Sequence, residues 1–246
     1  MVPARPSPWF KAIFAFYVER VLARSFASVG VGGLELLRDV VRERPVVVVS
    51  NHTSWWDPML LIYVTIRVLH VDAYALMRAD ELKRRPFLGR LGGFGVDLGS
   101  RMDRARVVRY GAKVLQSAGT LVWVFPQGRE RPVTAPLEFA PGAAAIARRA
   151  PHAVVVPAAM RYEHMELQQP RAFLSFGAPM TPSDDIESMC AAQREAVQQE
   201  LARIDAALVR DDYTQTYAPM LARRSPSRPG LLERALAVLT RYPEAR

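Results

Sequence analysis

The sequence predicts a single α/β domain with a twisted, mixed but mostly parallel sheet that is flanked by helices. The first observation is the run of four valines from Val46 to Val49, which has no polar face. Such a run is typical of a strand buried on both sides, as the strands of a parallel sheet are. The second is the succession of short apolar runs, such as 121–125, and stretches with helical periodicity, such as 102–116. Half of the 246 residues are hydrophobic, so the chain can bury a core of domain size.

The same patterns predict the other elements. We expect strands at 71–77 and 153–158, and an edge strand at 173–176. Helices are expected at 57–67, 143–149 and 183–209, the last of them long and amphipathic.

The chain is expected to have three segments and no internal repeat. Residues 1–30 form an apolar, amphipathic helical segment, and residues 31–222 form the α/β domain. Residues 223–246 are a basic linker followed by a short terminal helix at 231–240.

The N-terminal segment is strongly apolar and aromatic over 9–29. Its uncharged run, 12–18, has seven residues and is too short to cross a bilayer. Arg20 and Arg24 follow this run instead of preceding it, which disfavours a secretory signal. The pattern fits either a helix in the membrane interface, with Trp9 at headgroup level, or an ordinary core helix.

The formal net charge of +9 is unevenly distributed. Residues 78–109 hold nine basic and four acidic residues, whereas 181–212 hold eight acidic residues and three arginines. No zinc-finger spacing, RNP-like block or helix-turn-helix is present, so we expect no nucleic-acid partner. An anionic membrane surface fits the charge better. Cys190 is the one cysteine, which excludes an internal disulfide framework and a cysteine-based metal site.

His52 and Asp57 lie in the segment that leaves the valine strand. This edge of an open α/β sheet is where ligands bind, and a histidine oriented by a carboxylate can take a proton from a hydroxyl. Residues five apart point about 140° apart on a continuous helix, so the two side chains meet only if the chain turns between them. None of the other three histidines has an acidic residue at that spacing. The spacing alone also fits a capping histidine, with Asp57 as a helix N-terminal charge.

The segment Asn51-His52-Thr53-Ser54-Trp55-Trp56-Asp57 resembles the first motif of the glycerolipid acyltransferase family. That motif is a histidine and an aspartate separated by four residues. Val124-Phe125-Pro126-Gln127-Gly128-Arg129 resembles the third motif, normally Phe-Pro-Glu-Gly-Thr-Arg-Ser, and Val156-Pro157 resembles the fourth. The motifs follow the family's order and spacing, and the resemblance covers roughly residues 40 to 180.

Two motifs depart from the family's pattern. Gln127 replaces the usual glutamate, and Arg129-Glu130-Arg131 replaces Thr-Arg-Ser. In the second motif, Leu98 stands at the expected arginine position, with Arg101 and Arg104 a few residues later.

The resemblance implies an enzyme that moves a fatty acyl group from an acyl-CoA or acyl carrier protein thioester to a lipid hydroxyl. In such an enzyme His52 is the general base and Asp57 orients it. The residues implied to bind substrate are Asn51, Ser54, Arg101, Gln127, Gly128 and Arg129. No metal and no cofactor is required, because the thioester is itself a substrate. The glycines within 89–99 miss a dinucleotide fingerprint by one residue, so we expect no nucleotide cofactor there.

The implied acceptor is a lysophospholipid such as 1-acylglycerol 3-phosphate, an intermediate of phospholipid biosynthesis. The altered motifs leave a non-phosphate acceptor open, either a glycolipid or a carotenoid glycoside. A non-catalytic membrane-surface binding protein on the same fold is the third alternative. In family members an N-terminal helical element contacts the membrane. This favours the interface interpretation and a peripheral or monotopic location at the cytoplasmic face; the oligomeric state is left open by the sequence.

Overall fold

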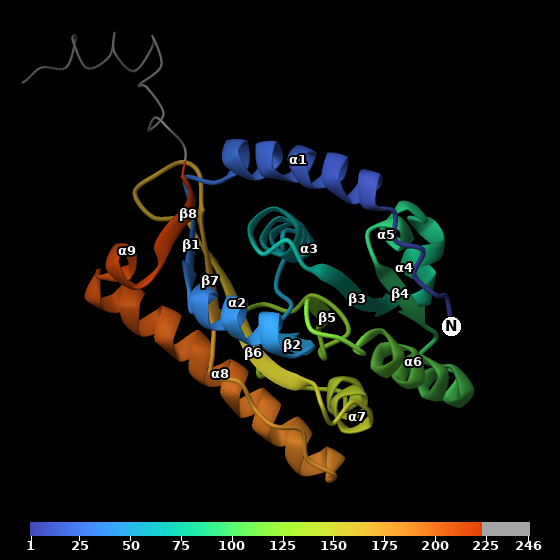
Figure 1. Cartoon of the computed structure of the whole chain (residues 1–246). Coiled ribbons are helices and arrows are strands. Elements are labelled where there is room, and N and C mark those ends of the chain that lie inside the picture. The colour runs from blue at the N-terminus through green and yellow to red at the C-terminus, as the bar shows by residue number, and fades with distance from the viewer. Residues whose placement is uncertain (223–246) are drawn as a thin grey trace, which may run out of the picture.

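Eight strands form one sheet in the computed structural model of the chain, which describes residues 1–222 (Figure 1). The strand order across the sheet is β4-β3-β5-β2-β6-β7-β1-β8. The pairs β6–β7 and β1–β8 are antiparallel and the other neighbours are parallel, which confirms the predicted mixed, mostly parallel sheet. The strands are β1 (Ser28–Gly32), β2 (Val46–Ser50), β3 (Asp72–Arg78), β4 (Gly93–Val96), β5 (Thr120–Val124), β6 (Val154–Glu163), β7 (Arg171–Phe176) and β8 (Ala218–Ala222).

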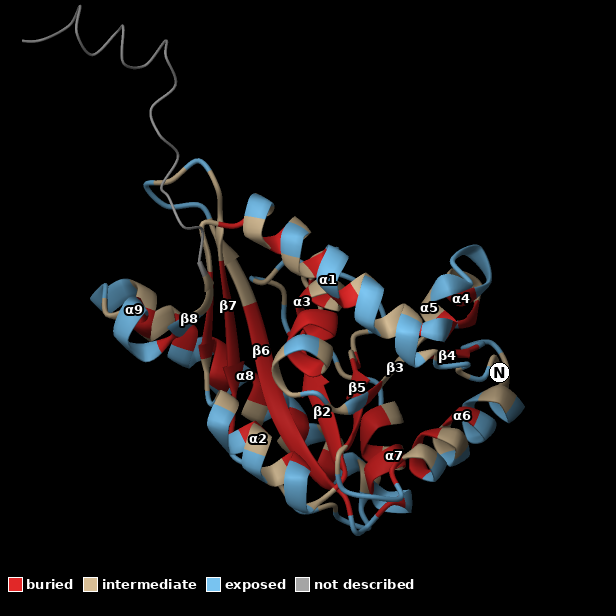
Figure 2. Ribbon diagram, turned by 45° about the horizontal axis from the view of Figure 1, so that its top comes forward, coloured by how far each residue is buried: buried red, intermediate tan, exposed pale blue. Residues whose placement is uncertain are grey.

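Helices cover both faces of this sheet (Figure 2). One face carries α1 (Pro8–Ser25), α2 (Leu34–Glu43), α3 (Asp57–Ile62) and the π-helix η1 (Tyr63–Val68). The other face carries α6 (Arg101–Val114), α7 (Gly142–Arg149) and α8 (Ile186–Arg210). The short helices are α4 (Ala79–Arg84), α5 (Phe87–Arg90) and α9 (Tyr213–Thr216).

The valine strand β2 is at the centre of the fold, as predicted. It pairs in parallel with β5 on one side and β6 on the other, and all five of its residues are buried. Val46 and Val48 pack in the core that α1 covers, whereas Val47 and Val49 pack in the core that α7 and α8 cover. Because both faces are covered, β2 has no polar residue until it reaches Ser50 at its carboxyl end.

The predicted helices at 102–116, 143–149 and 183–209 are confirmed as α6, α7 and α8. The helix predicted at 57–67 is also present, but it changes from α-helix to π-helix at Tyr63. Thr65 lies within the wider turn, and its hydroxyl donates to the Leu61 carbonyl oxygen at 2.7 Å. A single hydroxyl that binds the preceding turn in this way is one cause of irregular helix geometry.

The prediction of an edge strand at 173–176 was wrong, because β7 lies between β6 and β1. Sequence patterns missed β1, α2 and β8, of which the two strands extend the sheet beyond β7. Glycines make β1 a poor candidate for a strand, yet they are needed there. A Cβ atom on Gly30 would stand 3.0 Å from the backbone oxygen of Tyr217, which passes close beside the strand.

The N-terminal helix α1 is shorter than the apolar segment 9–29, since it ends at Ser25. Its side chains Ala15, Val18 and Leu22 are buried in the core that α3 and η1 share. No helix within residues 1–222 is long and apolar enough to span a membrane. The terminal helix predicted at 231–240, with its basic linker, lies outside the described residues.

The sheet divides between β3 and β5 near their carboxyl ends. The two strands pair from Asp72 opposite Thr120 to Ala75 opposite Trp123. Beyond Ala75, β3 pairs only with β4, up to Arg78. We call this opening the sheet fork, because the strands on its two sides continue in different pairs.

The glycine-rich stretch before α6 serves packing. Gly92 has a φ of 105°, and a Cβ atom on it would stand 2.3 Å from the Ala73 carbonyl oxygen. A Cβ atom on Gly95 would stand 2.9 Å from the Cα of Ala79. The absence of side chains therefore lets β4 approach β3 and α4 closely.

Candidate active site

His52 and Asp57 meet in the turn between β2 and α3. The distance from His52 Nδ1 to Asp57 Oδ2 is 2.7 Å. Asp57 is the first residue of α3, and Pro58 follows it in the first helical turn, where a missing backbone N–H costs nothing. The chain turns between the two residues, so their side chains come together in spite of the five-residue spacing.

The Asp57 side chain has no solvent exposure, and its two oxygens accept hydrogen bonds from several donors. Oδ2 accepts from the backbone N–H of Thr53 at 2.7 Å and from that of Ser54 at 3.1 Å. Oδ1 accepts from the Tyr162 hydroxyl. These donors offset the loss of hydration of the carboxylate. Since the ionised carboxylate can only accept, His52 carries its proton on Nδ1 and leaves Nε2 as the acceptor in the neutral ring.

Tyr162 is a component of the site that sequence reasoning missed. It belongs to the end of β6, which continues five residues beyond the predicted strand end at Ala158. Burial, followed by the nearby Asp57 charge, raises the pKa of Tyr162 well above its ordinary value of 10. The two residues are 105 positions apart, so no local motif could link them.

The loop after β5 holds the His52 ring and backbone in place. Phe125 stacks on the imidazole, with ring centroids 4.4 Å apart and planes inclined by 20°. The Gln127 Oε1 atom accepts from the His52 backbone N–H at 2.7 Å, and the Arg131 backbone N–H donates to the His52 carbonyl oxygen at 2.8 Å. Gln127 was expected to contact the substrate, but in the structure its side chain binds the His52 backbone.

Gly128 and Arg129 line a cavity beside His52, at the position expected of substrate-binding residues. Gly128 has a φ of 70°, in the left-handed region, and its N–H donates to the Phe125 carbonyl oxygen at 3.0 Å. Glycine adopts this conformation without the strain that a side chain would add. Arg129 is exposed at the cavity and follows directly from that tight turn.

Asn51 and Ser54, both expected at the substrate, are occupied by the backbone of the site. Asn51 is fully buried; its Nδ2 donates to the Met160 carbonyl oxygen at 2.9 Å and its Oδ1 accepts from the Met160 N–H at 2.8 Å. This amide joins the end of β2 to β6 much as a backbone peptide would. Ser54 Oγ accepts from the Trp56 N–H at 3.2 Å. Neither side chain lines the cavity, so the structure assigns both to shaping the turn.

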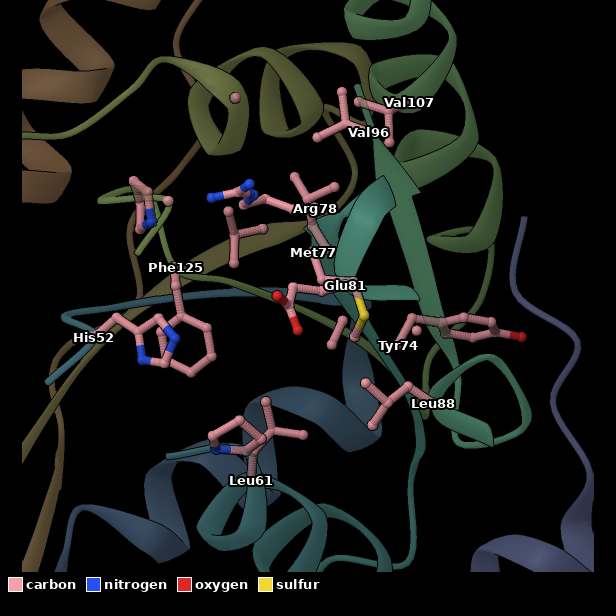
Figure 3. Close-up of a pocket in the computed structure, with 18 of the residues that line it drawn as sticks. His52, Leu61, Tyr74, Met77, Arg78, Glu81, Leu88, Val96, Val107 and Phe125 are labelled. Atoms are coloured by element: carbon pink, nitrogen blue, oxygen red, sulfur yellow. The ribbon is translucent and has the colours of Figure 1, made fainter. Parts of the chain in front are cut away.

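The cavity has a volume of about 1080 Å³ and extends from His52 through the sheet fork (Figure 3). Its walls are largely apolar, and Figure 3 shows Leu61 below the His52–Phe125 pair and Met77 across from it. Burial, and then the charge of Asp72, raises the pKa of Tyr74 to about 12, so this lining phenol is neutral at physiological pH. A cavity of this kind suits a long apolar ligand group.

Arg101, also expected at the substrate, does not line the cavity. It is the first residue of α6, and Arg104, one turn later, lines the wall instead. The Arg104 guanidinium donates to the carbonyl oxygen of Leu98, which also faces the cavity. Arg104 therefore takes the place at the cavity wall that was expected for Arg101.

Glu130 faces the free side of the histidine ring. Its Oε1 atom is 3.7 Å from His52 Nε2, and its side chain is 56% exposed. A negative charge consequently stands where a second substrate would approach the imidazole. Within residues 1–222 no group of three or more His, Cys, Asp or Glu side chains is arranged to hold a metal ion.

The comparison with protein families decides the class. The model of the family described as Acyltransferase matches residues 28–161, which include the His52 turn, the β5 loop and most of β6. The chain belongs to the Acyltransferase family. This membership confirms the family expected from the motifs and favours an enzyme over a non-catalytic binding protein.

A solved structure shows that the fold recurs elsewhere. The crystal structure of the 1-acyl-sn-glycerophosphate (LPA) acyltransferase PlsC from Thermotoga maritima matches with a TM-score of 0.60 and 19% sequence identity. The match covers 80% of this chain and 80% of that one. At this identity the likeness is one of fold. A search of the curated proteins finds no match.

The hydroxyl of Tyr162 is predicted to stabilise the folded state through Asp57. Tyr162→Phe removes one donor to a buried carboxylate and should lower the free energy of unfolding at pH 7 by about 1 to 3 kcal/mol. The unfolded chain ionises tyrosine near pH 10 and the folded chain does so at higher pH, so the stability tied to Tyr162 is present below pH 10 and declines above it.

Urea unfolding of wild type and Tyr162→Phe at pH 7 and at pH 10.5 measures both effects. The variant should lose less stability than wild type between the two pH values. Tyr17→Phe, at a tyrosine that is 54% exposed, is the control. Equal unfolding free energies for Tyr162→Phe and wild type at pH 7 contradict the prediction.

Proposed function

We propose that this acyltransferase moves a fatty acyl group from a thioester donor to the hydroxyl of a lipid acceptor. The observation that carries the proposal is the His52–Asp57 pair, 2.7 Å apart, at the wall of an apolar cavity of about 1080 Å³. An oriented base beside a large apolar cavity is what this chemistry requires, because the acyl chain needs a dry site and the hydroxyl needs a proton acceptor.

In the proposed reaction, His52 Nε2 takes the acceptor's hydroxyl proton as its oxygen attacks the thioester carbon. A C–O bond forms and the C–S bond breaks, and the imidazolium returns the same proton to the leaving thiolate. Asp57 stabilises the imidazolium and fixes the ring by its bond to Nδ1. Gln127 and Arg131 act as positioning residues, because they hold the two backbone groups of His52.

The leading acceptor is a lysophospholipid such as 1-acylglycerol 3-phosphate. Arg129 supports it, because an exposed guanidinium at the cavity can bind a phosphate through two hydrogen bonds. Coenzyme A and acyl carrier protein are both candidate carriers of the acyl group, as expected from the resemblance.

A second acceptor class is favoured by Glu130. Its carboxylate, 3.7 Å from His52 Nε2, repels a phosphate attached near the reacting hydroxyl. The same carboxylate can accept hydrogen bonds from neighbouring hydroxyl groups of a sugar headgroup. A glycolipid or carotenoid glycoside is therefore the second candidate.

We also propose that the enzyme works at the membrane surface, on the cytoplasmic face, through α1. Although one side of α1 is buried, its outer side carries apolar residues at one-turn spacing: Trp9 (63% exposed), Ile13 (61%), Phe16 (49%) and Tyr17 (54%). Arg20 lies 4.4 Å from the Phe16 ring centroid. An apolar outer stripe next to a cation suits the boundary between headgroups and acyl chains. Unlike Arg20, Lys11 is not expected to bind lipid headgroups, because its ammonium group pairs with Asp72 at 2.8 Å.

Replacement of the base should slow acyl transfer strongly. His52→Ala is expected to lower kcat by about 10² to 10⁴-fold without unfolding the protein, since a general base contributes a factor of this size. The measurement is transfer from labelled acyl-CoA and from labelled acyl carrier protein, with 1-acylglycerol 3-phosphate and a glycolipid as parallel acceptors. His164→Ala, at an exposed histidine outside the cavity, is the matched control. Full activity in His52→Ala would contradict the proposed chemistry.

Glu130 is predicted to set acceptor preference. Glu130→Gln removes the negative charge and keeps the size of the side chain. The ratio of kcat/KM for 1-acylglycerol 3-phosphate to kcat/KM for the glycolipid should rise about tenfold, which is the effect of one charge-assisted contact. Glu138→Gln is the control, because Glu138 lies in the same loop and is 82% exposed. A ratio that stays within twofold of wild type in Glu130→Gln excludes Glu130 as a determinant of acceptor class.

The outer stripe of α1 is predicted to drive vesicle binding. The double variant Ile13→Ser, Phe16→Ser should reduce partition onto phosphatidylglycerol vesicles by about tenfold or more, because two apolar side chains no longer enter the interface. The control is Val209→Ser, at a valine on α8 that is 87% exposed. Sedimentation with vesicles measures the partition. If Val209→Ser reduces it equally, α1 is not the contact.

A further inference from the structure

Four arginines form a second polar region of the cavity, away from His52. Arg104 and Arg109 come from α6, and Arg148 and Arg149 come from α7; all four are exposed and line the same cavity as the histidine. We call these four residues the arginine groove. Arg104 follows the second motif closely in the sequence, whereas the other three arginines lie outside all the motifs that predicted the His52 site.

The arginine groove has a floor of small residues. Ala105 of α6 and Gly142 and Ala145 of α7 line the cavity beside the arginines. A Cβ atom on Gly142 would meet nothing within 4 Å, so the space above it is open. A ligand can therefore lie close to the backbone of α7 at Gly142, between two helices that both carry groove arginines.

The arginine groove differs in its ion pairs from two other cationic side chains of the cavity, Arg78 and Arg85. Arg78 pairs with Asp80, and Arg85 pairs with Glu81 at 2.8 Å. For the four groove arginines, by contrast, the described part of the chain offers no carboxylate within ion-pair distance. Several like charges gathered in one concavity attract a multiply charged anion strongly.

A cluster of acidic residues adjoins the arginine groove at Arg148. Asp184, Asp185 and Glu187, at the start of α8, line a separate hollow that also includes Arg148. They do not line the cavity that holds His52. The charge that a ligand meets inside the cavity is thus that of the arginines, with Glu81 and Glu130 as the acidic lining residues.

The sheet fork connects the arginine groove with His52. Helices α6 and α7 cover the face of the sheet opposite α1 and α3, and the cavity is lined from both faces, by Leu61 on one and Val107 on the other (Figure 3). Helix α7 begins next to the loop after β5, because the Ala140 N–H donates to the Pro126 carbonyl oxygen. Its eight residues rise about 12 Å, so Arg148 and Arg149 lie at the end of α7 that is away from this loop. A ligand that reaches both places needs its anionic groups at the end of a long arm.

We propose that the arginine groove binds the nucleotide phosphates of an acyl-CoA donor, while the pantetheine arm runs through the sheet fork to His52. The proposal rests on the thioester chemistry proposed above. The 3′-phosphate and the diphosphate of coenzyme A are anions at the end of a long arm. The phosphate of 1-acylglycerol 3-phosphate is only a few bonds from the hydroxyl that reacts, so it has to lie beside His52.

The shape of the arginine groove favours a small molecule over a carrier protein. A stable protein–protein contact buries roughly 800 Å² on each partner and needs a broad surface. The groove arginines instead line the inside of a cavity, with a small-residue floor between them. Such a concavity fits phosphate groups better than it fits the broad surface of a folded carrier.

Direct binding tests the proposal without any need for turnover. Titration calorimetry with coenzyme A, dephospho-coenzyme A and pantetheine should give decreasing affinity in that order, because phosphates are removed stepwise. The double variant Arg109→Gln, Arg149→Gln should weaken coenzyme A binding by about tenfold or more and leave pantetheine binding unchanged. Arg106→Gln is the matched control: Arg106 lies on α6, pairs with Asp103 at 3.6 Å and does not line the cavity.

Steady-state kinetics distinguish binding of coenzyme A from binding of acyl carrier protein and of the acceptor. In the double variant, the KM for acyl-CoA should rise about tenfold with kcat within twofold, while the KM for 1-acylglycerol 3-phosphate stays constant. Equal binding of coenzyme A and pantetheine to wild type overturns the proposal. The proposal is also overturned if the double variant raises only the KM for the acyl carrier protein donor, or only the KM for 1-acylglycerol 3-phosphate. If His52→Ala retains full activity but coenzyme A binding follows the arginines, the proposed chemistry fails and the binding site stands.

Discussion

The site depends on a carboxylate that has been removed completely from water. Asp57 is tolerated at zero exposure because a ring N–H, two backbone N–H groups and a phenol donate to it. Each donor comes with a structural requirement. The backbone N–H groups require the tight turn after β2, and the phenol requires that β6 continue past the end of β2. If any of them is lost, a buried charge remains under-solvated, so the arrangement tolerates little adjustment.

The geometry around His52 follows from that constraint. The Asn51 amide binds the Met160 backbone at both ends, which aligns β2 with β6 at the level where Tyr162 can reach Asp57. On the other side, Gln127 and Arg131 tie the β5 loop to the His52 backbone. Elements from three adjacent strands therefore converge on Asn51 and His52. Where β3 diverges from β5, at the sheet fork, no strand within residues 1–222 fills the space, and the cavity lies there.

The sequence was most informative where the relevant contacts are local. The valine strand, the turn before Pro58 and the meeting of His52 with Asp57 could be read from a few neighbouring residues. The partners of Asn51 and Gln127 could not, because they lie 109 and 75 positions away, and both residues had been expected at the substrate. Arg101 was named and Arg104 lines the wall, since motif matching does not resolve which turn of a helix faces a cavity. The strands β1 and β8 escaped prediction because glycine and proline weaken their local signal, while tertiary pairing supplies their stability.

The long sequence separation inside the site has a consequence for biosynthesis. The turn that carries His52 and Asp57 leaves the ribosome before Met160 and Tyr162 are made. At a synthesis rate of about 5 to 20 residues per second, the 109 residues between Asn51 and Met160 take roughly 5 to 20 s. During that interval Asp57 lacks the phenol, and the end of β2 lacks the neighbour that its amide binds. The nascent chain therefore has no reason to bury this carboxylate early, and the completed β6 is the event that first makes its burial favourable.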